Sequence, residues 1–380
     1  MSFKYNKGEW AEVYVFLRLL SDGYLAIGDG SLTTVLSRLP IAEVARQNLA
    51  GKEFIYRING TNIDIVSGST VLFGVSRSQF AAKADELKAA IKGARSGTFG
   101  VSPSFDSFLL RIKIDNPKAK NLPTGSSSST YGGKCDIRLA YIEPTSGIKT
   151  NTGFSIKSSF GQPATLMNFS SASKFPVELY GADDGLMATV NSLHNSRGGA
   201  DTFSRCQAIL ASGVRPYIST PKRRGGRSVF EDNLRLINAD LVKILSECLY
   251  YSYFDPTIDS SVESLSNYLA TYGSFASSGY GRVFYPKVLK DFLFAVFGGM
   301  TPAKPWSGRI SANGGFIIAK RNWDIMVALS SNEGDFKDYL FLNTKIEHPA
   351  TTKKKGDFAY IYKVDSNYFF DLNFSVRFKK

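Results

Sequence analysis

The chain has 380 residues, of which 43% are hydrophobic and 21% charged, a composition typical of a globular protein that can bury its own core. Its 46 lysines and arginines outnumber 33 acidic residues, and the net charge of +13 favours a polyanionic partner, nucleic acid before membrane. With two histidines and three unevenly spaced cysteines, the composition excludes a His/Cys metal cluster and a disulfide framework.

The first hundred residues predict a mixture of helices and short strands. Apolar residues at helical spacing predict a helix over 6–20, which Asn6 and Glu9 begin in a capping-box pattern. Residues 31–50 predict one or two more helices. Residues 53–75 alternate between Gly and Asn turns and predict strands, and residues 77–94 predict a second long helix.

The middle of the chain predicts a hairpin. Residues 107–114 alternate as a strand, and the Ser- and Gly-rich stretch 121–133 favours a surface linker. The apolar runs 137–142 and 152–158 are bounded by turn residues and predict two paired strands. Asp136 at the start of one strand and Lys157 near the end of the other can meet on one sheet edge.

That pair of residues has two interpretations. An acid and a lysine on neighbouring strands form an edge salt bridge of little energetic consequence in many proteins. The same pair also suits a metal-dependent phosphodiesterase, in which the carboxylate holds Mg²⁺ and the lysine positions the attacking water. The two residues alone leave both interpretations open.

The rest of the chain predicts helices and then strands. A helix is predicted over 183–195, followed by a turn over 196–201 that contains Arg197, and a dense basic run over 221–227. Residues 230–251 predict a long helix, and 261–271 and 286–297 two more. Residues 314–380 return to strand character.

Three stretches carry a family resemblance. Residues 153–168, GFSIKSSFGQPATLMN, look like the signature of the HpaII-type restriction endonucleases, which belong to the PD-(D/E)XK nucleases. Residues 6–14, NKGEWAEVY, are similar to the opening helix of that family, and residues 368–378, YFFDLNFSVRF, resemble its closing strand. The stretches lie in order at the start, middle and end, so the resemblance spans the chain.

The resemblance implies a fold and a division of the chain into two functional regions. We expect an α/β protein with a PD-(D/E)XK restriction-endonuclease-like mixed central sheet flanked by helices. A mostly helical carboxy-terminal region and a closing β segment should follow. Residues 1–215 would form the nuclease core, and residues 216–380 a helical and β region for DNA recognition and dimerisation, unless the chain is one domain.

The resemblance also implies an activity. We expect a type II restriction endonuclease that uses Mg²⁺ to hydrolyse double-stranded DNA at a short palindromic site, CCGG or a related one. Such sites are read by two-fold symmetric dimers, so a homodimer is expected. The sequence shows no signal peptide, membrane-length apolar run, P-loop or dinucleotide fingerprint. We therefore expect a cytoplasmic protein with neither membrane nor nucleotide cofactor.

Within that family pattern, Asp136 would bind the metal with the Ile156 carbonyl, and Lys157 would position the water. The usual third acid stands two residues before the lysine, and here that residue is Ser155. Glu9 is the candidate replacement for this acid, although it could serve only as a helix cap. Glu178, on a later predicted strand, is the alternative acid.

Contacts with DNA are expected from two kinds of residue. Ser158 and Gln162 lie within the signature, whereas Arg197 and the basic run lie in turns suited to phosphate contact or, less readily, to base readout. The basic run contributes Lys222, Arg223, Arg224 and Arg227, and Lys353 to Lys355 form a second one. Two other functions stay open: a non-catalytic DNA-binding protein whose site has decayed at Ser155, and a structure-selective repair nuclease.

Overall fold

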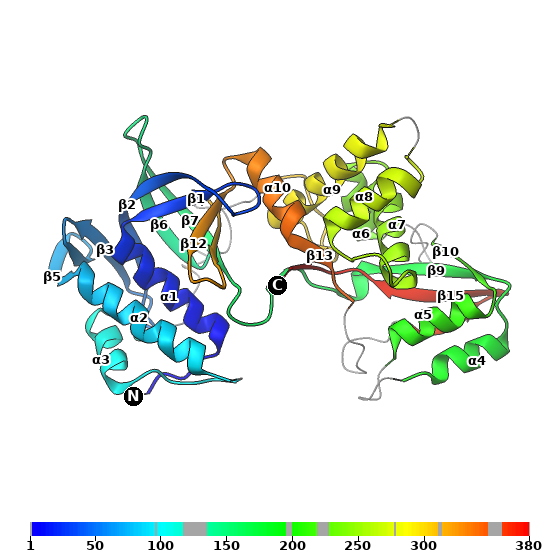
Figure 1. Cartoon of the computed structure of the whole chain (residues 1–380), viewed down its shortest axis with the longest axis horizontal. Helices are drawn as coiled ribbons and strands as arrows, with labels where there is room; N and C mark the ends of the chain where they lie inside the picture. The colour runs from blue at the N-terminus through cyan, green and yellow to red at the C-terminus, as the bar shows by residue number, and fades with distance from the viewer. Residues whose placement is uncertain are drawn as a thin grey trace. The chain divides into compact units, whose positions relative to one another are not determined.

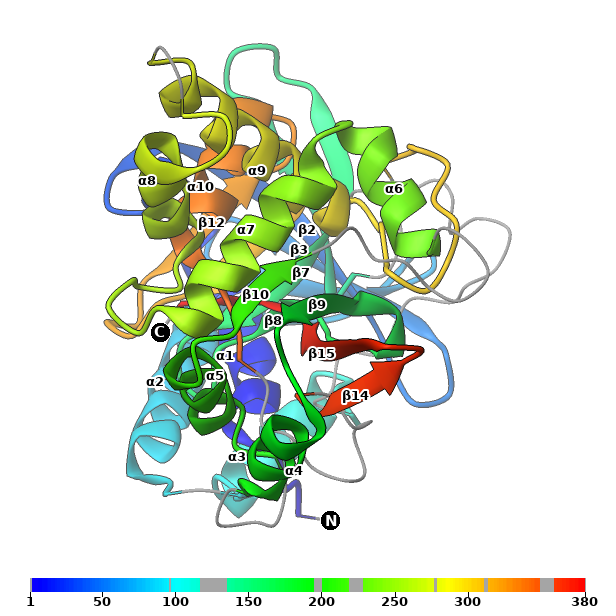
Figure 2. The same cartoon turned by 90° about the vertical axis from the view of Figure 1, so that its right-hand side faces the viewer.

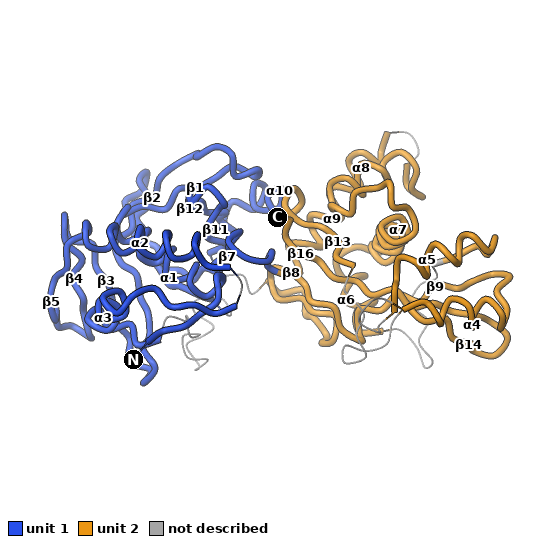
Figure 3. Tube along the Cα trace, turned by 60° about the horizontal axis from the view of Figure 1, so that its bottom comes forward, with its two compact units in different colours: residues 1–164, 311–339, 380 blue, residues 165–310, 340–379 orange. Residues whose placement is uncertain are grey.

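The chain folds into two compact units (Figure 1). A computed structural model describes residues 2–95, 97–116, 135–194, 200–218, 228–276, 279–310, 314–348 and 359–379. Unit 1 comprises residues 1–164, 311–339 and 380, and unit 2 comprises residues 165–310 and 340–379 (Figure 3). The chain thus leaves unit 1 and returns to it, and the boundary predicted near residue 215 falls inside unit 2.

Unit 1 is built on one mixed sheet of nine strands. Its helices are α1 (Lys7–Asp22), α2 (Arg77–Gly93) and α3 (Pro103–Arg111), and α10 (Glu333–Asn343) begins in this unit. Its strands are β1 (Tyr24–Gly28), β2 (Val35–Gln47), β3 (Glu53–Asn59), β4 (Asn62–Ser67), β5 (Thr70–Ser76), β6 (Ile137–Ile142), β7 (Lys149–Ser158), β11 (Gly315–Ala319) and β12 (Ile325–Leu329).

The strands follow the order β1-β12-β11-β7-β6-β2-β3-β4-β5, and β1 also pairs with β2. This extra pairing closes six of the strands into a barrel. The pairs β7–β11 and β1–β12 are parallel, whereas the other neighbouring strands of this sheet are antiparallel. The expected mixed sheet is therefore present, and the protein is of the α/β class.

The helices predicted over residues 31–50 are wrong, because this segment forms the long strand β2. Residues 35–40 pair with β1, residues 41–45 with β6, and residues 43–47 with β3. Pro40 has no amide hydrogen to donate and would disrupt a helix interior, but a strand accommodates it. Pairing along the whole length of the segment outweighs its local helical preference.

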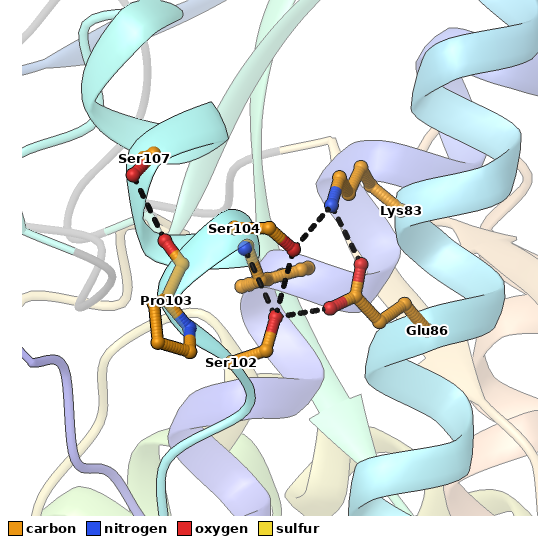
Figure 4. Close-up of polar contacts among 7 residues, drawn as sticks. Lys83, Glu86, Ser102, Pro103, Ser104 and Ser107 are labelled. Atoms are coloured by element: carbon orange, nitrogen blue, oxygen red, sulfur yellow. Dashed lines mark hydrogen bonds and ion pairs between the residues drawn. The ribbon is translucent and has the colours of Figure 1, made fainter.

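The strand predicted over residues 107–114 is also wrong, because residues 103–111 form α3. Ser102 accepts a hydrogen bond from the Phe105 amide at 3.1 Å, and Pro103 occupies the first turn, both of which start a helix. Figure 4 shows that Ser102 also donates to Glu86 of α2, which pairs with Lys83 at 2.7 Å. The buried side chains then follow helical spacing: Phe105, Phe108, Leu109 and Ile112.

Helix α1 is the centre of the unit 1 core. It packs against α2 and also against β1, β2, β7 and β11. A helix enclosed in this way is apolar nearly all round, and the residues buried along it are Trp10, Ala11, Val13, Tyr14, Val15, Phe16, Leu17, Leu19 and Leu20. It ends at Gly23, whose φ of 76° lies in the left-handed region that glycine tolerates best.

Unit 2 combines helices with two small sheets (Figure 2). The sheets have the orders β10-β9-β15-β14 and β13-β16-β8. The strands are β8 (Thr165–Met167), β9 (Lys174–Tyr180), β10 (Arg215–Ile218), β13 (Thr344–Ile346), β14 (Ile361–Val364), β15 (Asn367–Asn373) and β16 (Val376–Phe378). The helices are η2 (Ser171–Ser173), α4 (Asp184–Ser192), α5 (Thr202–Ala211), α6 (Val229–Ile237), α7 (Leu241–Phe254), α8 (Val262–Tyr272) and α9 (Gly281–Phe297).

The predicted helices of unit 2 are confirmed, with one division. The helix expected over 230–251 is two helices, α6 and α7, because Asn238 adopts an extended conformation with φ −159° and ψ 137°. The predicted strands near 315–319, 323–328, 360–364 and 368–378 are also present. Within residues 314–380, helix α10 and strand β13 were not predicted.

A fully buried arginine holds one side of unit 2 together. The Arg205 guanidinium donates to three backbone carbonyls, those of Leu193 at 2.8 Å, Ala359 at 2.6 Å and Asn191 at 2.9 Å. It also lies 3.9 Å from the centre of the Tyr360 ring. Arg205 thereby joins α5 to the end of α4 and to the residue that precedes β14.

The three cysteines, Cys135, Cys206 and Cys248, are buried and form no disulfide. Burial raises the pKa of each thiol, and the Asp136 carboxylate raises that of Cys135 further. These thiols are therefore packing groups and poor nucleophiles. Among the described residues, no helix is both long enough and apolar enough to cross a membrane.

Candidate active site

The β6–β7 hairpin brings Asp136 to the strand that carries Lys157. The strands pair antiparallel as the sequence predicts, and their register places Ile137 opposite Phe154. The Asp136 amide donates to the Phe154 carbonyl at 2.8 Å, and the Asp136 Oδ2 accepts from the Ile156 amide at 2.8 Å. The side chain of Asp136 thus continues the ladder of hydrogen bonds, and its carboxylate is held against β7 between Ser155 and Lys157.

The residues expected to act together share one face of the sheet. Side chains alternate along a strand, and Ile137 and Phe154 are buried in the core beneath α1. Asp136, Ser155 and Lys157 therefore lie on the opposite face, and all three are half-buried. The structure brings together Asp136, Ser155, Ile156 and Lys157 from the predicted set.

The parallel partner β11 supplies a neighbour that the sequence analysis missed. Phe316 pairs with Ser155 and Ile318 with Lys157. The Lys157 ammonium lies 5.1 Å from the centre of the Phe316 ring, a cation–π distance. That ring also packs against two aromatic residues of α10, Phe336 and Tyr339. No local pattern reveals this contact, since β11 is far from β7 in the sequence.

An aromatic cluster fixes the segment that leaves β7. Phe160 stacks on Trp323 of the β11–β12 turn, with ring centres 4.1 Å apart and planes 25° apart. The Tyr14 hydroxyl of α1 donates to the Trp323 carbonyl at 3.0 Å, and the Tyr14 ring packs edge-on against both aromatic rings. The backbone of Trp323 has a φ of 75°, a strained value for a large side chain.

Ser158 and Gln162 belong to this exit segment. The Ser158 hydroxyl accepts from the Phe160 amide at 3.0 Å, so it already has a structural role in closing the turn. Gln162 is exposed. Helix α2 adds positive charge nearby, since the ammonium groups of Lys88 and Lys92 lie 5.5 and 5.6 Å from the centre of the Trp323 ring.

The two candidate acids, Glu9 and Glu178, lie in different units of the chain. Glu9 lies in the first turn of α1, where its Oε2 accepts from the Asn6 amide at 3.0 Å and Asn6 accepts from the Glu9 amide at 3.0 Å. The capping box is therefore formed. Glu178 lies on β9 in unit 2, where its Oε2 accepts from the Tyr180 hydroxyl at 3.2 Å.

The donor set suits one kind of metal site. Among the described residues, no group of three His, Cys, Asp or Glu side chains is arranged to hold a metal ion. Asp136 offers one carboxylate, whose Oδ1 accepts no hydrogen bond from the described part of the chain. Mg²⁺ is commonly bound by one or two carboxylates together with water and substrate phosphate. These residues fit Mg²⁺ held in that way, and they do not fit an all-protein cage.

Several predicted contacts lie outside the described residues. These are Arg197 and the basic run with Lys222, Arg223, Arg224 and Arg227, together with Lys353 to Lys355.

The face that carries Asp136 continues as a polar surface across β7, β6, β2 and β3. Glu43 pairs with Arg57 at 2.8 Å and with Lys149 at 2.8 Å, and Arg138 pairs with Glu53 at 2.6 Å. Burial acts to raise the pKa of Glu43, but hydrogen bonds from Lys149 and Arg57 outweigh it and hold the pKa below its usual value. Glu43 is thus a charged acceptor at neutral pH.

A hollow of about 180 Å³ opens in this surface. Glu43, Arg138 and Asn151 contribute polar groups to its lining, and small or apolar side chains complete it, among them Ala45, Ile55 and Ala140. No local sequence signal predicts this grouping of residues, because it depends on strand register.

The comparisons with known proteins agree with one another. Residues 6–378 match the sequence family described as HpaII restriction endonuclease. The chain is 32% identical to the type II restriction enzyme HpaII of Haemophilus parainfluenzae over 381 residues, which cover 99% of each chain. No solved structure matches this chain.

Proposed function

Because the chain belongs to the HpaII restriction endonuclease family, and is thus a type II site-specific deoxyribonuclease, we propose that it hydrolyses both strands of double-stranded DNA at a short palindromic site with Mg²⁺. One observation carries the assignment of the site. The Asp136 carboxylate is hydrogen-bonded to the strand that holds Lys157, one residue from it, on a shared sheet face. The proposed target is CCGG or a related sequence, as the family resemblance of residues 153–168 implies.

In this proposal the metal is held by Asp136 and the Ile156 carbonyl, with Glu9 as the second acid. Ser155 stands where a third acid is usual, and its neutral hydroxyl is a weaker ligand for a hard cation. Bound Mg²⁺ would neutralise phosphate charge and lower the pKa of a bound water. The hydrogen bond from Ile156 holds the Asp136 carboxylate in a fixed orientation, so Oδ1 is presented without the cost of ordering a side chain.

In the proposed reaction, Lys157 acts on the attacking water and on the phosphoryl oxygens. Hydrolysis forms a bond from the water oxygen to phosphorus and breaks one phosphorus–oxygen ester bond, and negative charge accumulates on the phosphoryl oxygens. An ammonium group beside them stabilises that charge and orients the water. Phe316 supports the lysine, because its ring attracts the ammonium and partly shields it from solvent.

DNA contact is proposed for both units. In unit 1 the proposed contacts are Ser158 and the exposed Gln162, which end or follow the strand that carries Lys157, and Lys88 and Lys92, which lie over the Trp323 ring. Arg197 and the basic run over 221–227 are proposed to contact phosphates, and residues 216–380 to serve recognition and dimerisation. The net charge of +13 supports a polyanionic substrate. We also propose a PD-(D/E)XK-like core, a homodimer that matches a palindrome, and a cytoplasmic location.

The test is incubation with a long phage DNA of known sequence, in Mg²⁺ and in EDTA, followed by sequencing of the ends. Discrete fragments with a common end sequence, formed only with Mg²⁺, support the proposal and supply the recognition site. Intact DNA in Mg²⁺ together with a salt-sensitive gel shift would indicate a DNA-binding protein without catalysis. Cleavage confined to branched or flapped substrates would indicate a structure-selective nuclease.

A further inference from the structure

We propose that the hollow lined by Arg138, Glu43 and Asn151 receives the base edges of the DNA beside the cleaved phosphate, so that these three residues contribute to sequence specificity in addition to residues 216–380. The inference rests on the proposed function, because it names the part of the substrate that the surface next to the catalytic residues binds.

Strand register places the hollow directly beside the catalytic residues. Each row consists of residues that are paired across neighbouring strands, and successive rows follow one another along the strands. The row of Ser155 and Asp136 is followed by a row with Gly153, Arg138, Ala45 and Ile55. The next row contains Asn151, Ala140, Glu43 and Arg57. All three rows face the same way, since every second residue of a strand shares a face. The hollow therefore belongs to the surface from which Asp136 and Lys157 act.

The spacing of these rows is about two base-pair steps. Two residues along a strand span about 7 Å, so the first row of the hollow lies about 7 Å and the second about 13 Å from the row of Asp136. Successive bases along one DNA strand are about 3.4 Å apart. The hollow thus lies about two to four base-pair steps from the cleaved bond, the range that a short recognition site must occupy.

The polar groups of the hollow match base edges. An arginine can donate two parallel hydrogen bonds to guanine O6 and N7, and a glutamate can accept from cytosine N4. Arg138 and Glu43 therefore suit a G·C pair. The Asn151 side chain is exposed and makes no hydrogen bond within the described residues, so its amide can serve a further base.

The surrounding ion pairs hold these groups in place before DNA arrives. Glu53 pairs with Arg138, and Arg57 and Lys149 each pair with a different oxygen of Glu43. The side chains of Arg138 and Glu43 are only 19% and 17% exposed. Fixed side chains discriminate better than mobile ones, because a wrong base leaves their buried polar groups unpaired. The small side chains of Ala45 and Ala140 leave the hollow open between Arg138 and Glu43.

The experiment measures cleavage of duplex oligonucleotides that carry the site found in the phage digest, or that site with one base pair changed. The variants are Arg138→Gln, Glu43→Gln and Asn151→Ala, and kcat/KM for the correct site is divided by kcat/KM for each altered site. We expect each variant to lower this ratio about 10- to 100-fold at one base-pair position and to leave the other positions unchanged.

Arg111→Gln is the matched control. It removes a positive charge from an exposed position at the end of α3, and Arg111 neither lines the hollow nor pairs with a residue that does, so every ratio should stay within about twofold of the wild type. Asn151→Ala guards against misfolding of the other variants, because its side chain is exposed and unbonded in the described structure. Unchanged ratios in all three variants, with activity intact or uniformly reduced, would refute the inference alone. A wild-type protein that cuts no discrete site would refute both this inference and the proposed function.

Discussion

Asp136→Asn is the substitution that best separates the charge of the proposed metal ligand from its structural role. The Asp136 Oδ2 accepts the Ile156 amide at 2.8 Å, and the amide oxygen of an asparagine can accept the same hydrogen bond. The asparagine NH₂ group then occupies the position of Oδ1 and repels a cation. We expect cleavage to fall at least about a thousandfold, which corresponds to about 4 kcal/mol of transition-state stabilisation.

Asp136→Ala should add a loss of stability to that loss of cleavage. It removes one half-buried hydrogen bond to a charged acceptor, which contributes about 1–2 kcal/mol after allowance for solvent. For a unit of about 200 residues this corresponds to a melting temperature lower by about 3–6 °C. Asp136→Asn should melt within about 2 °C of the wild type.

The assay follows cleavage of the phage DNA in Mg²⁺, thermal unfolding, and DNA binding in EDTA by gel shift. Binding should survive both substitutions within a few-fold, because the polyanion contacts lie elsewhere. An Asp136→Asn protein that cuts within tenfold of the wild-type rate would refute the metal-ligand role. Equal melting of the alanine variant and the wild type would refute the structural role of the hydrogen bond.

Substitutions at four further residues test the site and its support. Lys157→Ala should lower cleavage at least about a hundredfold while specific binding in a gel shift stays within a few-fold; full activity would contradict the assignment. Glu9→Ala should nearly abolish cleavage with folding intact. Glu9→Gln keeps the capping hydrogen bond, so it should nearly abolish cleavage without lowering the melting temperature. A Glu9→Gln protein that cuts normally would mean that Glu9 is only a helix cap. Arg205→Met should cost about 4 kcal/mol in denaturant unfolding, because three buried carbonyls lose their charged donor; a loss under 1 kcal/mol would contradict this. Burial acts to raise the pKa of Glu86, but its hydrogen bonds to Lys83 and Ser102 hold it below the usual 4.5. The resulting stabilisation is present above about pH 4.5 and is lost as pH falls through the lower folded pKa, so Glu86→Gln should flatten the acid limb of a stability–pH curve.

Parts of the site that depend on local signals could be predicted from the sequence. The β6–β7 hairpin has alternating strands bounded by turn residues, so Asp136 and Lys157 could be placed side by side before the structure was known. The start of α1 was equally visible, because Asn6 and Glu9 form a capping box from four consecutive positions. Such signals lie within a few residues of the groups that they position.

Features that depend on distant pairing could not be predicted in this way. Phe316 reaches Lys157 through a parallel strand contact, and no turn residue announces such a partner. Strand β2 was mistaken for helix because its three pairing partners, and not its own residues, determine its conformation. The start of α3 carried usable signals in Ser102 and Pro103, but alternation over the following residues concealed them. A unit completed by residues 311–339 is likewise invisible to a search for contiguous domains.

The position of β7 between β6 and β11 has a consequence for biosynthesis. One neighbour is available as soon as the hairpin is made, but the other is supplied by residues 315–319. At about 5–20 residues per second, a ribosome needs roughly ten to thirty seconds to travel from Lys157 to Ala319. During that interval the strand with Lys157 has an unpaired edge, and the ring under the lysine is absent. Nascent or truncated chains therefore cannot assemble the complete site, and nuclease activity is delayed until most of the polypeptide has been released from the ribosome tunnel.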